Sequence, residues 1–357
     1  MINVDGSQGE GGGQVLRTSL SLSALTGRPF QITKIRANRS RPGLRPQHLT
    51  AVKAVAELCR AQLDGAELDS MELAFRPGSP PQSGEYRFDV TEASASGLSA
   101  GAVTLIVQAI LWPLLFAVGP SRVVLRGGTF VPFSPPYHYL AEVARPAFTR
   151  FGGEISVELS RWGWMTAGDG EMALTVEPVT GLSAVEFERP KIDEVNGVAA
   201  VTNLPSHIPH RMARRAHNLI AEAGLNPSIQ SLREKGAGPG AGIVLWVPQA
   251  GFSSLGKQGL PAEKVAEAAV ADLLSFVDNG AAVDYHLADQ LLLPMALAEG
   301  HSSYTTSRLT RHTETNIGLL RQWLSATIDV DGALDEPAQV SVKSDGFSLA
   351  GAAKQDL

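Results

Sequence analysis

One arrangement of apolar segments recurs along the chain and constrains the fold more than any other feature of the sequence. A helix-like apolar run ends at a glycine turn, which stops helices well. A strand-like segment follows, and a second helix-like run and a second strand come after a loop. Sequence identity between the copies is low. The segments are 14–25, 30–36, 47–63 and 71–75; then 103–118, 122–126, 137–151 and 154–159; then 289–298, 303–309, 315–324 and 326–330. We therefore expect an α+β fold with three repeated units.

The spacing of the turn glycines predicts an insertion. The interval from Gly119 to Gly300 exceeds the interval from Gly27 to Gly119 by 89 residues. The segment 181–278 has helical patterns of its own and a glycine-rich piece, Gly236–Gly242. That length is enough for a small domain. We expect a large discontinuous domain, a smaller inserted α+β domain and a C-terminal tail. Their bounds are 1–180 with 279–345, 181–278, and 346–357.

Composition excludes several classes of protein. The 357 residues include one cysteine, which excludes a disulfide framework and any multi-cysteine metal site. A formal net charge of −6 argues against coating nucleic acid by bulk charge. The five tryptophans are scattered along the sequence and form no stacking strip for single strands. The most apolar run, 102–118, contains Gln108 and Pro113, which favours a buried core helix over a membrane span.

The charge is unevenly distributed. The stretch from Gly11 to Ala56 has eight Lys and Arg residues and no acidic residue, a formal +8 that leaves −14 for the rest of the chain. Arginine grips phosphate with a planar, bidentate fork. The pattern favours a site for a polyanion, and the alternative is a solvated basic surface. The loop at the centre of the stretch contains Arg36, Arg39, Arg41 and Arg45.

A glycine-rich run opens the chain. Four of the five residues from Gly9 to Gly13 are glycine, and the exception is Glu10. Glycines before a helix let backbone N–H groups face a phosphate. Glu10 would suit Mg²⁺ or Mn²⁺ carrying substrate phosphates, and Arg17 could reach the same phosphates. The alternative is a glycine-rich turn with a capping glutamate.

Three further sites are open to two interpretations each. His312 precedes a helical pattern and could be a nucleophile, a general base or a surface residue. The segment His286–Gln290 could cap a helix or bind the ribose and base of a nucleotide. Gln108 is an isolated polar residue on an apolar helix, so it needs either a ligand or a neighbouring carbonyl as its partner.

Together these motifs resemble those of RNA 3′-terminal phosphate cyclases. The matches run in order over almost the whole chain, a series far more specific than any one piece. The matching segments are 6–17, 35–39, 42–49, 127–129, 134–136, 287–298 and 312–316. The resemblance implies three units of two helices on a four-stranded sheet, plus a smaller inserted domain.

The resemblance also implies an activity. A histidine attacks the α-phosphorus of ATP, with a divalent metal ion present, and forms enzyme–AMP with loss of pyrophosphate. AMP then passes to an RNA 3′-terminal phosphate, and attack by the 2′-hydroxyl leaves a 2′,3′-cyclic phosphate. The partners would be ATP, Mg²⁺ or Mn²⁺ and the RNA end. The protein would act in the cytoplasm without a membrane partner, and it could form a homodimer.

By position, the resemblance makes His312 the nucleophile and Glu10 the metal-linked glutamate. The residues that would bind phosphate or the RNA end are Arg17, Arg36, Arg39 and Gln47. Those that would line the nucleotide pocket are Gln108, His286, Leu287, Ala288, Asp289 and Gln290. His286 stands where the family commonly has a tyrosine. Two rival classes are a non-catalytic ribosome-assembly branch, which lacks the nucleophile, and an enolpyruvyl-type transferase with the same repeats.

Overall fold

The computed structural model describes residues 1–9, 12–94, 97 and 99–349. Glu10 therefore lies outside the described residues. The first unit forms a four-stranded sheet in the order β1-β2-β4-β3. Strands β1 and β2 are parallel, and the other pairs are antiparallel. Its elements are β1 (Ile2–Asp5), α1 (Gly13–Thr26), β2 (Phe30–Thr33), α2 (Pro46–Cys59), β3 (Gln62–Asp64) and β4 (Leu73–Arg76).

The second unit repeats this topology with the order β5-β6-β8-β7. Its second helix is one helical segment with a π turn, Leu140–Ala144, between α4 and α5. The elements are β5 (Glu85–Asp89), a 3-10 turn (Val90–Ala93), α3 (Val103–Leu115), β6 (Ser121–Gly127), α4 (Tyr137–Tyr139), α5 (Arg145–Thr149), β7 (Ile155–Arg161) and β8 (Gly170–Val176).

The third unit has the same order again, β10-β15-β17-β16, with the short strand β9 also paired to β15. Its elements are β9 (Leu182–Ser183), β10 (Glu186–Phe187), α8 (Tyr285–Leu297), β15 (Ala298–Thr306), α9 (Arg311–Trp323), β16 (Thr327–Asp331) and β17 (Ala338–Asp345). The predicted α+β fold of repeated helix–sheet units is thus confirmed. Each unit also has two strands that the repeated pattern did not contain, the leading strand and one of the two strands after the second helix. These are β1 and β3, β5 and β8, and β10 and β17.

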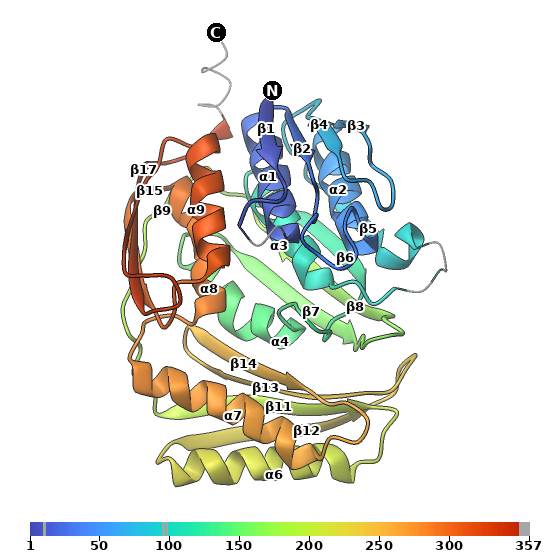
Figure 1. Ribbon diagram of the computed structural model, residues 1–357, viewed down its shortest axis with the longest axis vertical. Coiled ribbons are helices and arrows are strands. Elements are labelled where there is room, and N and C mark those ends of the chain that lie inside the picture. The colour runs from blue at the N-terminus through green and yellow to red at the C-terminus, as the bar shows by residue number, and fades with distance from the viewer. Residues whose placement is uncertain (10–11, 95–96, 98, 350–357) are drawn as a thin grey trace.

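The helices of the three units pack against one another, with the sheets outside them (Figure 1). Helix α3 lies at the centre, and Gln108 is its only residue that is not fully buried. This environment explains why the run around Gln108 and Pro113 is so apolar. Cys59 is also buried, and burial raises the pKa of its thiol to about 12, so it is an inert core residue. Among the described residues, no helix combines the length and apolarity that crossing a membrane would need.

The inserted unit forms its own sheet, in the order β12-β11-β13-β14, with α6 and α7 on one face (Figure 1). Those helices and the sheet enclose a separate apolar cluster. The elements are β11 (Glu194–Thr202), α6 (His207–Glu222), β12 (Asn226–Glu234), β13 (Gly240–Val247), β14 (Ala250–Leu255) and α7 (Ala262–Asn279).

Strand pairing places the first few residues of the predicted inserted domain in the third unit. Strands β9 and β10 lie within the range 181–278, but both hydrogen-bond to β15. We therefore place the start of the inserted unit after Phe187. The first residues of the predicted tail contact the fold, because Phe347 donates its N–H to the carbonyl of Leu297 and packs edge-on against Phe116.

One of the expected turn glycines is not a turn. Gly27 is a left-handed C-cap, with φ 70°, and its N–H bonds to the carbonyl of Ser23. Gly300, in contrast, lies inside β15 opposite Ser344. Helix α8 ends at Leu297, and the chain passes directly into an extended Ala298 that pairs with Leu182. The turn prediction at Gly300 is wrong because the strand begins without a connecting loop.

Three of the scattered tryptophans meet in space. Trp162 and Trp164 stack with their ring centroids 5.3 Å apart and an interplanar angle of 7°. Phe130 stacks on Trp164, and His138 lies between Trp162 and Trp246. Most of this stack is buried between the second unit and the inserted sheet. It is therefore an internal contact rather than an open platform for bases.

Candidate active site

A pocket lined by both polar and apolar side chains lies where α1, α3, α8 and α9 meet. The residues that line it are Gln14, Arg17, Thr18, Val107, Gln108, Leu111, Trp112, Leu140, Phe148, Asp289, Gln290, Leu293 and Asn316. The cavity has a volume of about 40 Å³, which is room for a few water molecules. A nucleotide would require the lining side chains to move apart.

His312 lies at the edge of this pocket in the first turn of α9. Its Nδ1 atom is 2.8 Å from Oε1 of Gln14, and Nε2 of Gln14 donates to Asp289 at 3.1 Å. Because the Gln14 amide nitrogen faces a carboxylate, its oxygen faces the imidazole, so Nδ1 of His312 carries the proton. The lone pair is then on Nε2, the nitrogen that a nucleophilic imidazole uses.

The start of α9 shapes the environment of His312. Thr310 is the N-cap, and its hydroxyl accepts the N–H of Thr313. The first turn of a helix carries partial positive charge. This charge favours an anion bound beside it. Asn316, one turn further on, is buried and bonds both Thr18 and the backbone of Asp289.

A second chain of hydrogen bonds crosses the pocket floor. Arg17 donates from Nε to Gln108 at 3.1 Å, and Gln108 donates from Nε2 to Gln290 at 3.1 Å. Gln290 in turn donates to the carbonyl of His286. The partners of Gln108 are therefore two other predicted site residues, and one of them, Oε1 of Gln290, is a neighbouring carbonyl oxygen.

Arg17 keeps its charge in this setting. Desolvation by the surrounding protein lowers the pKa of its guanidinium to about 10, and Asp289 opposes that shift. A cation with this pKa is protonated at pH 7. The site thus presents a fixed, partly desolvated positive charge, which attracts phosphate more strongly than a solvated charge does.

Cations also crowd the glycine run. The Cβ that a side chain at Gly13 would carry lies 2.4 Å from Nε2 of His48, and the one at Gly12 lies 3.2 Å from Arg39. His48 is buried, and its pKa is well below the usual value because of desolvation and the nearby charges of Arg36, Arg17 and Arg45. Desolvation and the charge of Arg39 likewise lower the pKa of Arg36. Arginine side chains that repel one another beside backbone N–H groups favour the binding of an anion.

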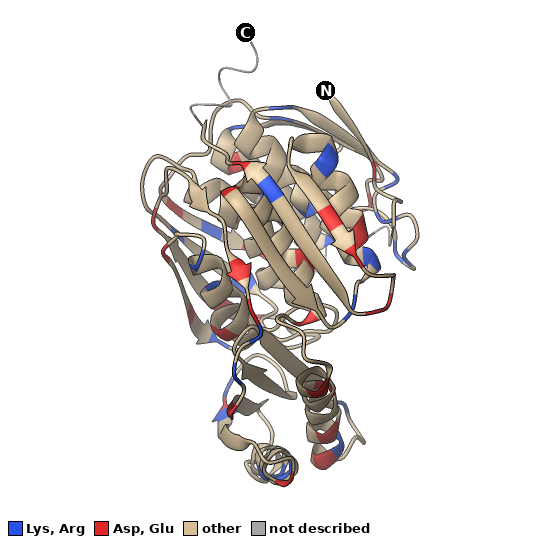
Figure 2. Ribbon diagram, turned by 90° about the vertical axis from the view of Figure 1, so that its left-hand side faces the viewer, with Lys and Arg blue, Asp and Glu red and all other residues tan. Residues whose placement is uncertain are grey.

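The basic stretch is otherwise dispersed. Arg28 donates to the carbonyl of Trp323, Lys34 pairs with Asp5, and Arg45 pairs with Asp69. Elsewhere Lys and Arg are interspersed with Asp and Glu, as the view onto the third unit shows (Figure 2). Only part of the formal +8 therefore lies at the site.

The other predicted site residues lie outside the pocket lining. Leu287 and Ala288 are fully buried in the main core, where their side chains cannot contact a ligand. The His286 ring is exposed and lies against Tyr285 and Tyr139. Gln47 accepts the N–H of Ala102 at 2.9 Å and so joins α2 to the start of α3.

Two residues that the sequence did not single out belong to the site. Gln14 connects His312 to Asp289, and Asn316 connects α9 to α8. Their positions in the sequence could have identified them, since each is a polar residue in the first turns of a helix and stands next to a motif already named. Among the described residues, no cluster of three or more His, Cys, Asp or Glu could hold a metal ion.

Fold and site define a protein of three α+β units and an inserted unit, in which Arg17 and Asp289 line a pocket and His312 bonds Gln14 at its edge. The family model described as RNA 3′-terminal phosphate cyclase matches residues 8–330. A protein of that name from Nostoc punctiforme is 52% identical over 349 residues, covering 96% of this chain and 99% of the relative. One from Pyrobaculum aerophilum is 41% identical over 330 residues, covering 90% and 92%. The chain therefore belongs to the RNA 3′-terminal phosphate cyclase family and is an enzyme.

Among solved structures, an enolpyruvyl transferase, NikO from Streptomyces tendae, matches 97% of this chain and 49% of its own. The TM-score is 0.30 and the identity 13%, and this likeness carries no argument.

Proposed function

We propose that the chain uses ATP to convert an RNA 3′-terminal phosphate into a 2′,3′-cyclic phosphate, through a covalent adenylate on His312. The observation that carries this proposal is the hydrogen-bonded series from His312 through Gln14 to Asp289. It gives the imidazole the tautomer that nucleophilic attack needs. It does so beside a pocket that also contains Arg17 and Gln108.

In the first step, Nε2 of His312 attacks the α-phosphorus of ATP. A nitrogen–phosphorus bond forms, the bond to the bridging oxygen breaks, and pyrophosphate leaves. An oxygen of the RNA 3′-phosphate then attacks the phosphorus of the bound AMP and displaces the histidine. In the last step the 2′-hydroxyl attacks the 3′-phosphorus and AMP leaves. Each transfer depends mainly on positioning and on neutralising phosphate charge.

The described residues fit these tasks in two groups. Arg17, Gln108, Asp289 and Gln290 line the pocket and would bind the nucleotide. Arg39 lies beside Gly12. Arg36 donates to the carbonyls of Arg41 and Gly43, and desolvation and the nearby charge of Arg39 lower its pKa. Both arginines would bind the phosphate of the RNA end. His286 would contribute at the rim, through its exposed ring.

The metal ion would be Mg²⁺ or Mn²⁺, bound with Glu10 and the phosphates of ATP. Mg²⁺ typically keeps several waters and binds through one or two carboxylates plus substrate phosphates. When bound, the ion would neutralise charge on the transferring phosphate. The cytoplasmic location and a homodimer stay predictions.

The test is incubation with α-³²P-ATP and Mg²⁺ or Mn²⁺, followed by acid and base treatment of the protein. We expect label that is acid-labile and base-stable, present in His301→Ala, an exposed histidine control, and lost in His312→Ala. RNA ending in a 3′-phosphate should then release the label as AMP, and RNA ending in a 3′-hydroxyl should not. A wild-type protein that takes up no label would rule out the covalent step.

A further inference from the structure

The inserted sheet meets the second unit at three glycines on one face. These are Gly240 and Gly242 on β13 and Gly251 on β14. A Cβ at Gly240 would lie 2.0 Å from the Trp164 ring, and one at Gly251 would lie 2.7 Å from the Tyr139 ring. At Gly242 the corresponding distance to Phe130 is 2.8 Å. Real side chains do not approach this closely, so the glycines allow aromatic rings to rest on the strand backbone.

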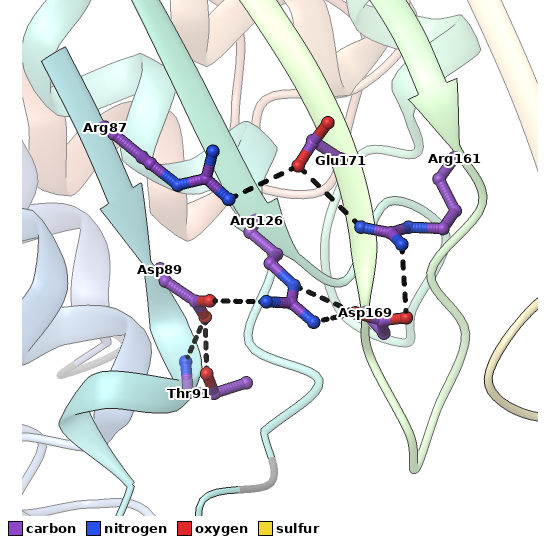
Figure 3. A network of polar contacts seen from close by, with 7 residues as sticks. All are labelled: Arg87, Asp89, Thr91, Arg126, Arg161, Asp169 and Glu171. Carbon is purple, nitrogen blue, oxygen red and sulfur yellow. Dashed lines mark hydrogen bonds and ion pairs between the residues drawn. The ribbon is translucent and has the colours of Figure 1, made fainter.

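The second unit holds its side of this contact rigidly. Trp164 lies in the β7–β8 connection and donates its indole N–H to Thr202 at 2.7 Å. The same connection ends at Asp169, which Arg126 and Arg161 both pair with on the outer face of the sheet (Figure 3). Arg126 also pairs with Asp89 at 3.3 Å. The ion pairs therefore fix the loop that presents the aromatic rings.

One buried carboxylate connects this contact to helix α8. Asp284 accepts the Tyr139 hydroxyl at 3.0 Å and the N–H of Gly251 at 2.9 Å. It also caps α8, since it accepts the N–H groups of His286 and Leu287 at 2.7 and 2.8 Å. The donors come from the second unit, the inserted unit and the third unit. A buried carboxylate is costly to leave unpaired, so these donors define where the start of α8 can lie.

The position of α8 matters because this helix carries one wall of the pocket. Asp289 and Gln290 follow Asp284 by about one and a half turns. Gln290 bonds back to the carbonyl of His286 and across to Gln108. A shift at the capped end of α8 therefore moves the two residues that face Gln14 and Gln108.

We propose that the inserted unit is a positioning element for the nucleotide pocket, and that it acts through Asp284, a positioning residue that holds α8 between Gly251 and Tyr139. This proposal rests on the proposed function in one respect, which is that ATP is the ligand of the pocket. The competing explanation is that the same contacts only stabilise the fold.

The two explanations predict different kinetics. We would titrate α-³²P-ATP in single-turnover labelling of the full chain, using Tyr139→Phe and Gly251→Ala. The first removes one donor to Asp284, and the second forces β14 away from the ring. The matched controls are Tyr86→Phe, whose hydroxyl bonds Gln82 at 2.9 Å, and Gly181→Ala, where a Cβ has open space.

A positioning role predicts that the half-saturating ATP concentration rises about ten-fold, or about 1.4 kcal/mol, in both test variants. The rate at saturation should change by less than about three-fold, and the controls should match the wild type. Loss of folded protein instead lowers the labelled fraction without moving the half-saturating concentration. That second pattern would overturn the proposal, and Tyr139→Phe keeps the test valid if Gly251→Ala does not fold.

Hydrogen exchange separates this proposal from the proposed function. The backbone amides of residues 285–290 should exchange faster in both test variants than in the controls. Faster exchange supports the positioning role even if the wild type takes up no label from ATP, which would count against the proposed function alone. Exchange at the wild-type rate would refute the positioning role.

Discussion

Nδ1 of His312 lies 2.8 Å from Oε1 of Gln14, although 298 positions separate the two residues in the chain. Gln14 stands in the first turn of α1 and His312 in the first turn of α9. The contact therefore joins the first unit to the third and brings two positive helix ends together. The account of the site depends on this pairing, because it fixes which imidazole nitrogen is nucleophilic.

Replacing Gln14 tests that dependence. Gln14→Leu removes the acceptor for the Nδ1 proton and the donor to Asp289. Loss of hydrogen bonds of this kind costs about 1 to 3 kcal/mol, so we expect the rate of self-adenylylation to fall roughly ten-fold to one-hundred-fold. Rapid-quench labelling with α-³²P-ATP measures it. Gln62→Leu, an exposed position on β3, is the control, and an unchanged rate in Gln14→Leu would show that Gln14 does not set the tautomer.

Gln108 should affect ATP binding more than the chemical step. Gln108→Leu leaves Arg17 and Gln290 without their shared partner but keeps the size of the side chain. We expect the half-saturating ATP concentration to rise about ten-fold, with a smaller change in the rate at saturation. Titration of ATP in the labelling assay measures both. A reduced rate at saturation with normal half-saturation would place Gln108 in the chemical step instead.

Arg39 should act on the RNA end. It lies beside Gly12, and His48 lies beside the adjacent Gly13. Arg39→Ala should raise the RNA concentration needed for cyclisation about ten-fold or more while leaving self-adenylylation nearly unchanged. The comparison needs both assays on the same preparation. Equal losses in the two would mean that Arg39 contacts ATP.

Stability should fall as the pH drops below about 6.5. Desolvation lowers the pKa of His138 to about 4, and desolvation and nearby cations hold the pKa of His48 well below 6.5. The unfolded chain therefore binds more protons than the folded chain in this range. Each histidine should reduce the free energy of unfolding by up to about 1.4 kcal/mol per pH unit, down to its folded pKa.

Urea unfolding followed by tryptophan fluorescence between pH 7.5 and 4 measures that slope. His138→Phe keeps a ring between Trp162 and Trp246 but removes the titrating group. Its slope between pH 6.5 and 4 should be shallower than that of the wild type. Identical slopes would show that His138 is not a source of the acid sensitivity.

The repeats were predictable where the chain has strong periodicity. The apolar run of α3 is a buried core helix, as predicted, and Gly27 does end helix α1. The repeated pattern assigned one strand to each helix, so it missed β1, β3, β5, β8, β10 and β17, of which β8 and β17 have seven and eight residues. Gly300 was wrongly predicted to form a turn, because the sequence alone does not distinguish a glycine inside a strand from a glycine that ends a helix.

The motifs named candidate site residues, but they did not indicate which contacts those residues make. The contiguous segment 286–290 suggested five ligand contacts, whereas helical geometry directs Leu287 and Ala288 into the core and leaves Asp289 and Gln290 at the pocket. The role of Gln14 depends on a partner 298 positions away, which no local pattern encodes. The docking of the inserted unit depends likewise on glycines whose neighbours are distant in sequence.

The most direct test of the account is to locate the AMP. The wild-type chain would be incubated with ATP and Mg²⁺ or Mn²⁺, digested under alkaline conditions and analysed by tandem mass spectrometry, with His312→Asn as the matched variant. We predict one AMP per chain, attached to the imidazole of His312, and no adduct in His312→Asn. An adduct on another residue, or an unmodified wild-type chain, would contradict the account.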